Sequence, residues 1–529
     1  MSNSSIISNQ TSQKIRAQFP IFNDSSSSNY SNGSYTNDRS SYQTQNESGL
    51  DKAVNKNADL VYLDSSATTQ KPKVVIDTLL EYYSKYNSNV HRGVYKISEI
   101  SEQLWTQSHK IVAKFLNSTP EEIVMVSNTT HAVNFVAMSY CTEYLSEGDV
   151  IAVNEMDHHS NMLPWIKAAE LVKAKVEWIP ITDSFEPDLN YIDFLIRKYR
   201  SKLKLLATTE VGNVLGTRLP LKKIIEMCKK NGTKVFVDGA QAVSHSMVDV
   251  RKIDCDFYAF SGHKLYAPNG TGALYINSQI RESLKPFMYG GGQIKDVTRS
   301  SIQWEDSPTK FESGTQSIGE VVAFARAILW FWDTLEVLSA DTSTEIDKVL
   351  TVKELCPEVS EGSYNDSTYG TSSSYSSNVY NSSYGNNTYS QSTNTNGQDL
   401  LCDKVMNFKV NRVNWGKVKD GYKKLHQHEN TLIDIVRIYT QSSDKFKVFG
   451  PQSEIDRYGL ITLLSEELHP HDLASLLAQD NICVRAGMHC AHPLHRRFGQ
   501  NASLRMSLGI YNNLDDVKKF IKAINSAKL

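Results

Sequence analysis

The sequence predicts an α/β fold in which short, buried strands of a largely parallel sheet alternate with helices. Two apolar runs, Val235–Val237 and Phe257–Phe260, have the length and the side chains of buried strands. Each run ends in a polar tetrapeptide, Asp238–Gln241 (DGAQ) after the first and Ser261–Lys264 (SGHK) after the second. Because side chains at the carboxyl ends of parallel strands share one crevice, we expect these polar groups to meet there.

Length and composition are those of a large globular enzyme. The chain has 529 residues, enough for about two to four domains with substantial cores. A net charge of -2 and a pI near 6.7 provide no basic field for nucleic acid or an anionic membrane. The apolar stretches are shorter than the ~18 residues of a membrane helix. Seven cysteines, an odd number without regular spacing, indicate reduced thiols.

The two tetrapeptides carry the groups that pyridoxal phosphate requires. Lys264 can form a Schiff base with the aldehyde. Asp238 can keep the pyridine nitrogen protonated, so that the ring accepts electrons. Gln241 can bond the ring hydroxyl, while Ser261 and His263 can donate to the phosphate. Each residue alone could be an exposed lysine or a turn residue, but their joint occurrence at two successive strand ends favours the cofactor.

A third strand is expected at Glu122–Val126, followed by Ser127–Thr130 (SNTT) and by a helix that starts near His131. Hydroxyls and backbone amides at a helix start form a phosphate cradle. Thr129 and Thr130 are therefore candidate phosphate ligands, and Thr130 could also serve as a helix cap.

Two further strands end in polar loops. Val150–Val153 leads to the adjacent His158 and His159, and Leu203–Thr208 leads to a loop that contains Asn213. Adjacent histidines could bind a metal ion, but neighbouring side chains rarely converge on one ion without further ligands. No metal site is predicted.

Two biased segments interrupt the α/β pattern. Asn23 to Asn57 and Glu361 to Gly397 are rich in Ser, Asn, Tyr and Thr and nearly free of aliphatic residues. Such segments bury too little apolar surface to offset chain entropy, so we expect disordered surface insertions. The second lies between helices expected at about 318–338 and 418–439. A partner-binding tether or an aggregation-prone element is the alternative role.

The stretch Val235–Tyr275 resembles the core of class V, fold-type I pyridoxal-phosphate enzymes, and is most similar to the SufS-type cysteine desulfurases. The similarity covers most of the chain outside the biased segments. Its other motifs are KIRAQFPIF (14–22), LVYLDSSATTQKP (60–72), NVHRGV (89–94), RAGMHCAHP (485–493) and RMSLGIYN (505–512).

This resemblance implies a fold-type I transferase with a large parallel or mixed sheet domain of about seven strands and a smaller α+β domain. The expected divisions are an N-terminal segment with an insertion (1–58), a large cofactor-binding domain (59–325), a linking helix (326–340), a low-complexity insertion (341–415) and a small C-terminal domain (416–529).

The resemblance also implies roles around the cofactor. His158 would lie flat against the pyridine ring and exchange protons, and Asn213 would contact the ring hydroxyl. Thr129 and Thr130 match the pair that contacts the phosphate. Thr315 matches a threonine that reaches the phosphate in the neighbouring subunit, which implies a homodimer.

Cys490 selects the reaction among the chemistries that this cofactor supports. It lies in Arg485–Ala491, which matches the cysteine-bearing loop of the SufS-type enzymes. A thiol there can attack the substrate sulfur and keep it as a persulfide while alanine leaves. A buried structural cysteine is the alternative. A zinc site with the nearby histidines lacks a partner CxxC or HxxxH motif.

By the same resemblance, Arg505 clamps the substrate carboxylate, because a guanidinium can bind a carboxylate through two hydrogen bonds. Arg485 would act beside it, and His91 and Arg92 would line the mouth of the site. The chain departs from the common family pattern at Glu210 and Gly212, where histidine and serine are frequent, and at Ala486 and Met488, where threonine and histidine are frequent.

The expected function is conversion of L-cysteine to L-alanine, with the persulfide of Cys490 passed to a SufE- or SufU-type acceptor for iron–sulfur cluster assembly. The alternatives are a selenocysteine lyase or another β-lyase on the same fold, and a catalytically silent scaffold that binds partners through its insertions. No apolar signal core precedes the enzyme-like sequence, so a cytoplasmic location is expected, or a plastid if an upstream targeting segment is missing.

Overall fold

The computed structural model describes residues 5–23, 59–91, 93–346, 352, 354–355, 401–452 and 457–528. The insertions predicted at 23–57 and 361–397 lie outside the described residues, apart from Asn23. Arg92 is outside them as well.

A seven-stranded mixed sheet forms the centre of the large domain. In sheet order its strands are β3 (Ile123–Val126), β9 (Gly272–Ile276), β8 (Phe257–Ser261), β7 (Lys234–Asp238), β6 (Leu203–Thr209), β4 (Val150–Asn154) and β5 (Lys175–Ile179). Strand β9 is antiparallel to both of its neighbours, and the remaining pairs are parallel. The predicted fold class is confirmed, including each strand that the apolar runs indicated.

Helices cover both faces of this sheet, as a sheet that is apolar on both faces requires. Val124 and Val126 of β3 face a cluster with α5 and α7, whereas Ile123 and Met125 face a cluster with α4, α8, α9 and α12. The helices are α3 (Lys73–Glu81), α4 (Lys96–Phe115), α5 (Thr129–Val136), α6 (Thr142–Tyr144), α7 (Leu163–Val172), α8 (Leu189–Tyr199), α9 (Leu221–Asn231), α10 (Val250–Ile253), α11 (Ser278–Arg281) and α12 (Ile318–Ser339).

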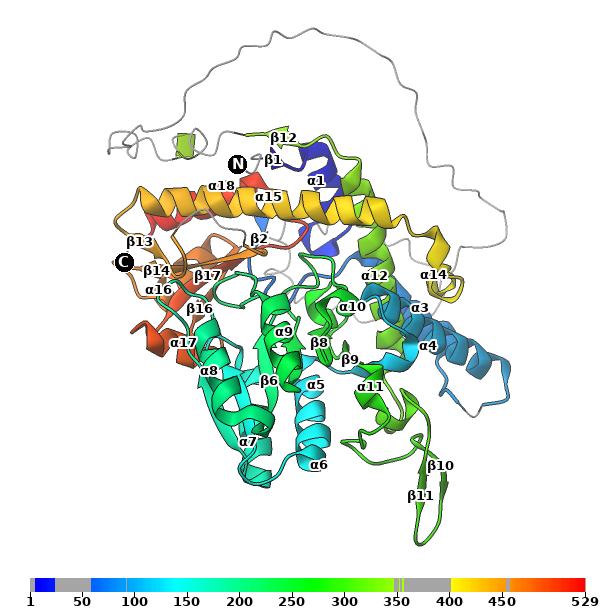
Figure 1. Ribbon diagram of the computed structural model, residues 1–529. Coiled ribbons are helices and arrows are strands. Elements are labelled where there is room, and N and C mark those ends of the chain that lie inside the picture. The colour runs from blue at the N-terminus through cyan, green and yellow to red at the C-terminus, as the bar shows by residue number, and fades with distance from the viewer. Residues whose placement is uncertain are drawn as a thin grey trace, which may run out of the picture.

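A second, antiparallel sheet forms the core of the C-terminal unit. Its strand order is β13 (Phe446–Val448), β14 (Leu460–Ser465), β17 (Ser503–Ser507) and β16 (Arg485–Gly487). The long helix α15 (Trp415–Gln441) runs across this unit and packs against α12, as Figure 1 shows. Helices α16 (Pro470–Gln479), α17 (His492–Arg497) and α18 (Leu514–Ser526) complete the unit, and α14 (Leu401–Met406) packs near α12.

Segments from the start of the chain connect the two units. Strand β2 (Val61–Tyr62) pairs in parallel with β15 (Ile482–Cys483). After helix α1 (Asn9–Arg16), the fully buried ring of Phe19 lies 4.9 Å from Tyr511 and 5.5 Å from Trp330 of α12, measured between ring centroids. These contacts bring residues 64–68 close to the C-terminal strands.

The hairpin of β10 (Ile294–Val297) and β11 (Ile302–Trp304) projects from the large domain (Figure 1). None of the helices within the described ranges has both the length and the apolar character that a membrane crossing would need.

Candidate active site

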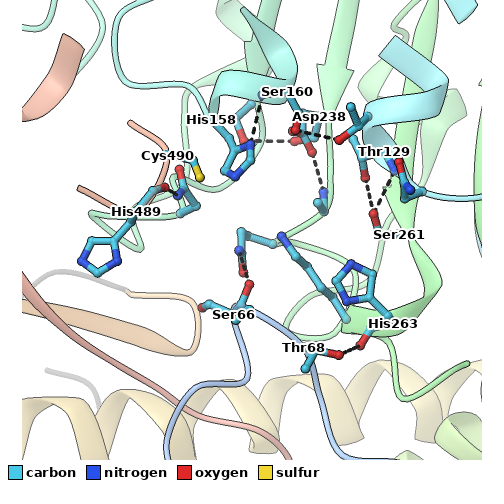
Figure 2. A pocket seen from close by; sticks show the side chains of 18 of the residues that line it. Ser66, Thr68, Thr129, His158, Ser160, Asp238, Ser261, His263, His489 and Cys490 are labelled. Carbon is cyan, nitrogen blue, oxygen red and sulfur yellow. Dashed lines mark hydrogen bonds between the residues drawn. The ribbon is translucent and has the colours of Figure 1, made fainter. Parts of the chain in front are cut away.

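A pocket of about 760 Å³ lies at the ends of β4, β6, β7 and β8, next to the loop that carries Cys490. Its lining includes most of the residues predicted from the sequence: Thr129, Thr130, His158, Asn213, Asp238, Gln241, Ser261, His263, Lys264, Arg485, Cys490 and Arg505. Figure 2 shows Cys490, His158 and Asp238 along one side of the pocket, with Ser66, Thr68 and His263 across from them.

Asp238 and Lys264 follow neighbouring strands, because β7 and β8 pair with Asp238 opposite Ala259. Lys264 ends the 3₁₀ turn Gly262–Lys264 and is half-buried. Burial lowers the pKa of Lys264 to about 8; the Asp238 carboxylate acts against this shift, and Arg505 adds to it. Burial raises the pKa of Asp238, although Lys264 and the N–H of Ala240, at 2.9 Å, favour its ionised form.

The turn that carries Lys264 is held through one carbonyl oxygen. The carbonyl of His263 accepts the N–H of Thr69 at 3.0 Å, the hydroxyls of Thr68 and Thr69 at 3.2 and 3.0 Å, and the amine of Lys71 at 3.0 Å. Segment 68–71 therefore sets the position of the residue that precedes Lys264. Burial lowers the pKa of the His263 imidazole to about 4, so this ring is neutral.

Hydroxyl groups surround the start of α5. The Oγ of Ser261 accepts the N–H of Thr129 and contacts its Oγ1, both at 2.8 Å. The Oγ1 of Thr130 lies 2.7 Å from the Oγ of Ser160. Asn128 caps the helix by accepting the N–H of His131 at 2.9 Å. Helix α5 begins at Thr129, two residues earlier than expected, so both threonines belong to its first turn, where an anion is favoured.

His158 is held as a neutral ring. Its Nδ1 accepts the backbone N–H of Ser160 at 3.1 Å, which assigns the ring proton to Nε2. Burial, with a further contribution from the charge of Lys264, lowers the pKa of His158 to about 3. Beside it, the buried Asp157 accepts Nδ2 of Asn161 at 2.6 Å and the N–H of Thr209 at 3.2 Å, which ties the end of β4 to the end of β6.

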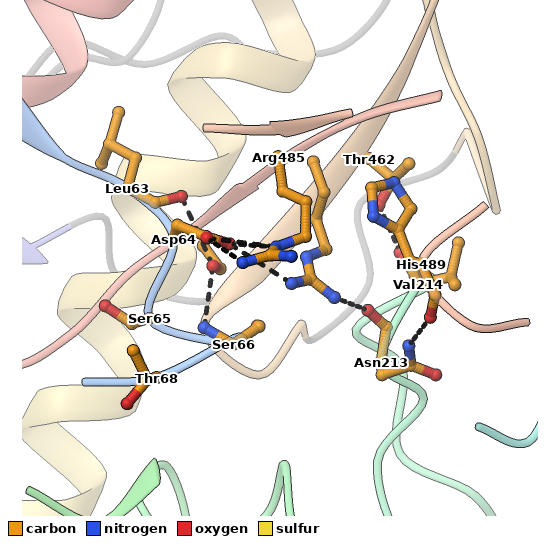
Figure 3. A network of polar contacts seen from close by, with 12 residues as sticks. Leu63, Asp64, Ser65, Ser66, Thr68, Asn213, Val214, Thr462, Arg485 and His489 are labelled. Atoms are coloured by element: carbon orange, nitrogen blue, oxygen red, sulfur yellow. Dashed lines mark hydrogen bonds and ion pairs between the residues drawn. The ribbon is translucent and has the colours of Figure 1, made fainter. Parts of the chain in front are cut away.

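One carboxylate bridges the two arginines of the pocket (Figure 3). Asp64 accepts Nε of Arg485 with both oxygens at 3.1 Å and its NH2 at 2.8 Å. The same carboxylate lies 3.4 Å from NH2 of Arg505, whose NH1 donates to the carbonyl of Asn213 at 2.9 Å. Burial lowers the pKa of Arg505 to about 10. Its buried Nε has no partner among the described residues.

The loop around Cys490 has an uncommon backbone conformation. His489 and Cys490 have φ of 49° and 55°, in the left-handed region that most residues avoid. The N–H of His159 donates to the carbonyl of Cys490 at 2.7 Å, and Nδ2 of Asn213 donates to the carbonyl of His489 at 2.8 Å. Cys490 itself is exposed. Over the described ranges no group of three or more His, Cys, Asp or Glu side chains could hold a metal ion.

Two predicted residues lie outside this pocket. Thr315 is exposed and contacts Nδ2 of Asn89 at 3.5 Å, and His91 pairs with Glu102, its Nδ1 lying 3.4 Å from the carboxylate. A hydrogen bond from the His91 ring to the Glu102 carboxylate raises the pKa of His91, although burial acts against this shift. Arg92 is not described.

The four departures from the common family pattern lie in different local surroundings. Glu210 is fully buried, pairs with Arg218 and accepts the hydroxyl of Tyr258 at 2.7 Å. A Cβ on Gly212 would lie 2.9 Å from the methyl carbon of Met156, so a larger residue would displace that side chain. Ala486 lines the pocket, and the carbonyl of Met488 accepts the N–H of Ala491 at 2.8 Å.

Sequence reasoning missed several residues of the site. Ser66, Thr68, Asn128, Ser160 and His489 line the pocket, and Asp64 holds its arginines. A signal for Asp64 and Ser66 is present in the motif LVYLDSSATTQKP, where they follow the short apolar run Leu60–Leu63. No role could be given to that motif before its place beside the C-terminal strands was known.

The groups of the pocket fit pyridoxal phosphate. A half-buried amine with a lowered pKa, a buried carboxylate on the neighbouring strand and a hydroxyl-lined helix start match its aldehyde, ring nitrogen and phosphate. Gln241 donates its Nε2 to the carbonyl of Ser66 at 3.0 Å, so its amide oxygen is available to the pocket. Fold and residues together define a fold-type I, pyridoxal-phosphate-dependent enzyme.

Comparisons with known proteins specify the family. The chain belongs to the aminotransferase class-V family, whose model matches residues 61–355 and 413–520. It is 31% identical over 471 residues to a cysteine desulfurase of Haloferax volcanii, covering 89% of each chain. It is 32% identical to a probable cysteine desulfurase of Vibrio cholerae, covering 90% of this chain and 96% of the relative.

Solved structures agree with this assignment. The apo structure of a cysteine desulfurase from Thermococcus onnurineus superposes with a TM-score of 0.67 at 27% identity, covering 88% of this chain and 94% of that one. The cysteine desulfurase CsdA of Escherichia coli gives a TM-score of 0.68 at 25% identity, covering 97% of both chains.

Proposed function

We propose that this protein is a cysteine desulfurase that converts L-cysteine to L-alanine and retains the sulfur as a persulfide on Cys490. The supporting observation is that Cys490 lines the same pocket as Lys264 and Arg505. Arg485 lines the same pocket. A cysteine thiol in this position can attack the sulfur of a bound substrate as a nucleophile.

Pyridoxal phosphate would be held by Lys264 at its aldehyde, by Asp238 at its ring nitrogen and by Thr129, Thr130 and Ser261 at its phosphate. When bound, it stabilises negative charge at the substrate Cα. His158 lies in the same pocket as a neutral ring with its proton on Nε2. It can orient the ring system and donate a hydrogen bond without adding charge.

Arg505 would bind the substrate carboxylate. Asn213 and Asp64 hold its NH1 and NH2, and the guanidinium lines the pocket, where it can pair with a carboxylate. Lys264, whose pKa is about 8, can both lose and regain a proton near neutral pH and is the base for the Cα proton.

Sulfur transfer needs no external oxidant. The Cys490 sulfur forms a bond to the substrate sulfur as the Cβ–S bond breaks, and the electron pair of that bond remains on the carbon fragment. Protonation of this fragment gives alanine. The products of L-cysteine and the Cys490 thiol are therefore L-alanine and the Cys490 persulfide.

Finer expectations extend this proposal. The enzyme is of the SufS type, acts as a homodimer in which Thr315 reaches the partner's cofactor phosphate, and works in the cytoplasm. The exposed position of Thr315 outside its own pocket supports a role in trans. The short Cys490 loop limits the reach of the persulfide, which supports a SufE- or SufU-type acceptor that delivers sulfur to iron–sulfur cluster assembly.

The test is to incubate the holoenzyme with L-cysteine, quantify alanine and map the persulfide by mass spectrometry. We expect the persulfide on Cys490, its loss in Cys490→Ala, and normal turnover in Cys483→Ala, a half-buried cysteine outside the pocket. Modification of another residue, or no alanine, would refute the proposal. Selenide release from selenocysteine that survives Cys490→Ala while cysteine turnover fails would identify a selenocysteine lyase instead.

A further inference from the structure

Ser503, at the start of β17, touches both sides of the Cys490 loop. Its buried Oγ lies 3.1 Å from Nε2 of His489, 2.9 Å from Nε2 of His495 and 3.3 Å from the carbonyl of Gly487. His489 precedes Cys490, and His495 lies five positions beyond it on α17. One hydroxyl thus connects the two flanks of the loop.

The acceptors determine which atoms carry the protons. Nδ1 of His495 lies 3.0 Å from the carbonyl of Ala491, which can only accept, so Nδ1 carries the proton. His495 is fully buried, and burial lowers its pKa, so the ring is neutral and its Nε2 is an acceptor. The single hydroxyl proton of Ser503 is therefore donated to His495 rather than to the more distant Gly487.

The Ser503 oxygen is then an acceptor for His489. Because Nε2 of His489 faces this oxygen, Nε2 carries the proton, and Nδ1 is left bare. Nδ1 is buried without a partner among the described side chains. The result is a hydrogen-bonded relay with one direction, from His489 to Ser503 to His495 to the carbonyl of Ala491.

The relay lies beside a stretch of backbone with an unfavourable conformation. His489 and Cys490 are consecutive residues in the left-handed region, which persists only where the surroundings over-determine it. In Figure 2 the His489 ring points away from His158 and Asp238, so its side chain serves the loop rather than the reacting groups.

We propose that the relay of His489, Ser503 and His495 holds the Cys490 loop in its left-handed conformation, which makes Ser503 and His495 positioning residues for the Cys490 sulfur. The functional part of this inference rests on the proposed role of Cys490 as the nucleophile. The structural part, which is the direction of the relay, does not.

The first test reads the protons directly in the holoenzyme with ¹⁵N-labelled histidine, with His495→Gln used to assign the signals. We expect His489 as the neutral Nε2–H form and His495 as the neutral Nδ1–H form near pH 7.5. The His495 Nε2 signal should shift in Ser503→Ala, because this nitrogen loses its donor. An Nδ1–H form or a cation at His489 would overturn the relay.

The second test measures positioning. Ser503→Ala should lower kcat by about tenfold or more with KM nearly unchanged, since displacement of a reacting group costs rate more than binding. Alkylation of Cys490 by iodoacetamide should change at least about threefold, because the loop no longer holds the sulfur in one exposed position. Ser503→Thr keeps the hydroxyl and should restore most of kcat and of the alkylation rate. Ser526→Ala, at an exposed serine of α18, should change neither kcat nor the alkylation rate.

If Ser503→Ala does not fold, His495→Gln is the second variant, because it also removes a hydrogen-bonding imidazole from the relay. Unchanged kcat and alkylation in a folded relay variant would overturn the positioning role. If the wild-type enzyme forms no alanine while the histidine signals and alkylation respond as expected, the proposed function fails and the relay stands.

Discussion

The backbone N–H of His159 donates to the carbonyl of Cys490 across 2.7 Å, which joins the loop that carries His158 to the loop that carries the proposed nucleophile. His492 strengthens this junction, because its N–H and its Nδ1 lie 3.2 and 2.7 Å from Nε2 of His159. Nε2 can accept both only in the neutral ring. Burial, followed by the proximity of His492, lowers the pKa of His159 and keeps it neutral.

This junction should weaken in acid. Because the folded state holds the pKa of His159 below its usual 6.5, the unfolded chain binds more protons below that pH, and the contribution to stability is lost as pH falls. His492→Ala should lower the free energy of unfolding by about 0.5–1 kcal/mol at pH 7.5, the value of one hydrogen bond, and by less at pH 5. Urea unfolding at both values measures this, with His469→Ala as the control. An equal effect at both pH values would contradict the prediction.

Lys264 should titrate far below an ordinary lysine. Acetylation of Lys264 in the cofactor-free protein, followed by mass spectrometry, should show a midpoint near pH 8. Asp238→Asn should lower this midpoint, because the carboxylate stabilises the ammonium form, and Arg505→Gln should raise it. The exposed Lys96 is the internal reference. Since the unfolded chain binds more protons between about pH 8 and 10.5, this group makes stability rise with pH across that window. A midpoint that neither substitution moves would refute the assigned electrostatics.

Asp64→Asn should impair substrate binding more than catalysis. The change removes the partner that fixes Arg485 through both carboxylate oxygens and one of the two contacts that hold Arg505. We expect KM for L-cysteine to rise about tenfold with a smaller effect on kcat, because the misplaced guanidiniums no longer match the carboxylate geometry. Asp59→Asn, at an exposed pair with Lys519, is the matched control. An unchanged KM in Asp64→Asn would argue against substrate binding between these arginines.

Gly239→Ala should disrupt the cofactor site. A Cβ at Gly239 would lie 2.0 Å from the hydroxyl of Tyr258, which bonds Glu210, so either this buried tyrosine or the end of β7 must move. We expect loss of most bound pyridoxal phosphate, measured by its absorbance after denaturation. Gly291→Ala meets nothing within 4 Å and should retain the cofactor. Full cofactor content in Gly239→Ala would show that Tyr258 can relocate.

Phe19→Ala should destabilise the whole protein, because this ring packs between α12 and the C-terminal unit. Removal of a fully buried phenylalanine typically costs about 3–5 kcal/mol. Phe194→Ala, at a ring that is 47% exposed, should cost much less. Chemical unfolding of both variants measures the difference. Similar losses in the two would show that the N-terminal segment does not contribute to the common core.

The sheet could be predicted because its strands are short apolar runs with polar ends, and that pattern survives without tertiary context. The same rule predicted that Asp238 and Lys264 lie close together, whereas the role of His158 at the cofactor was implied by the family resemblance. The rule did not predict Asp64, because the position of this residue depends on pairing between β2 and β15, which lie more than four hundred residues apart. The rule did not predict a role for Ser503 either. Nothing in the sequence around this serine indicates that its hydroxyl contacts the imidazoles of His489 and His495.

The parallel pairing of β2 with β15 also governs when the enzyme can acquire its activity. Asp64 is synthesised more than four hundred residues before its partners Arg485 and Arg505. The large sheet can form before that point, because its seven strands end at Ile276. A nascent chain can therefore bring Lys264 and Asp238 together first. It gains Arg485, Cys490 and Arg505 last, so a ribosome-bound intermediate that lacks them has an incomplete pocket.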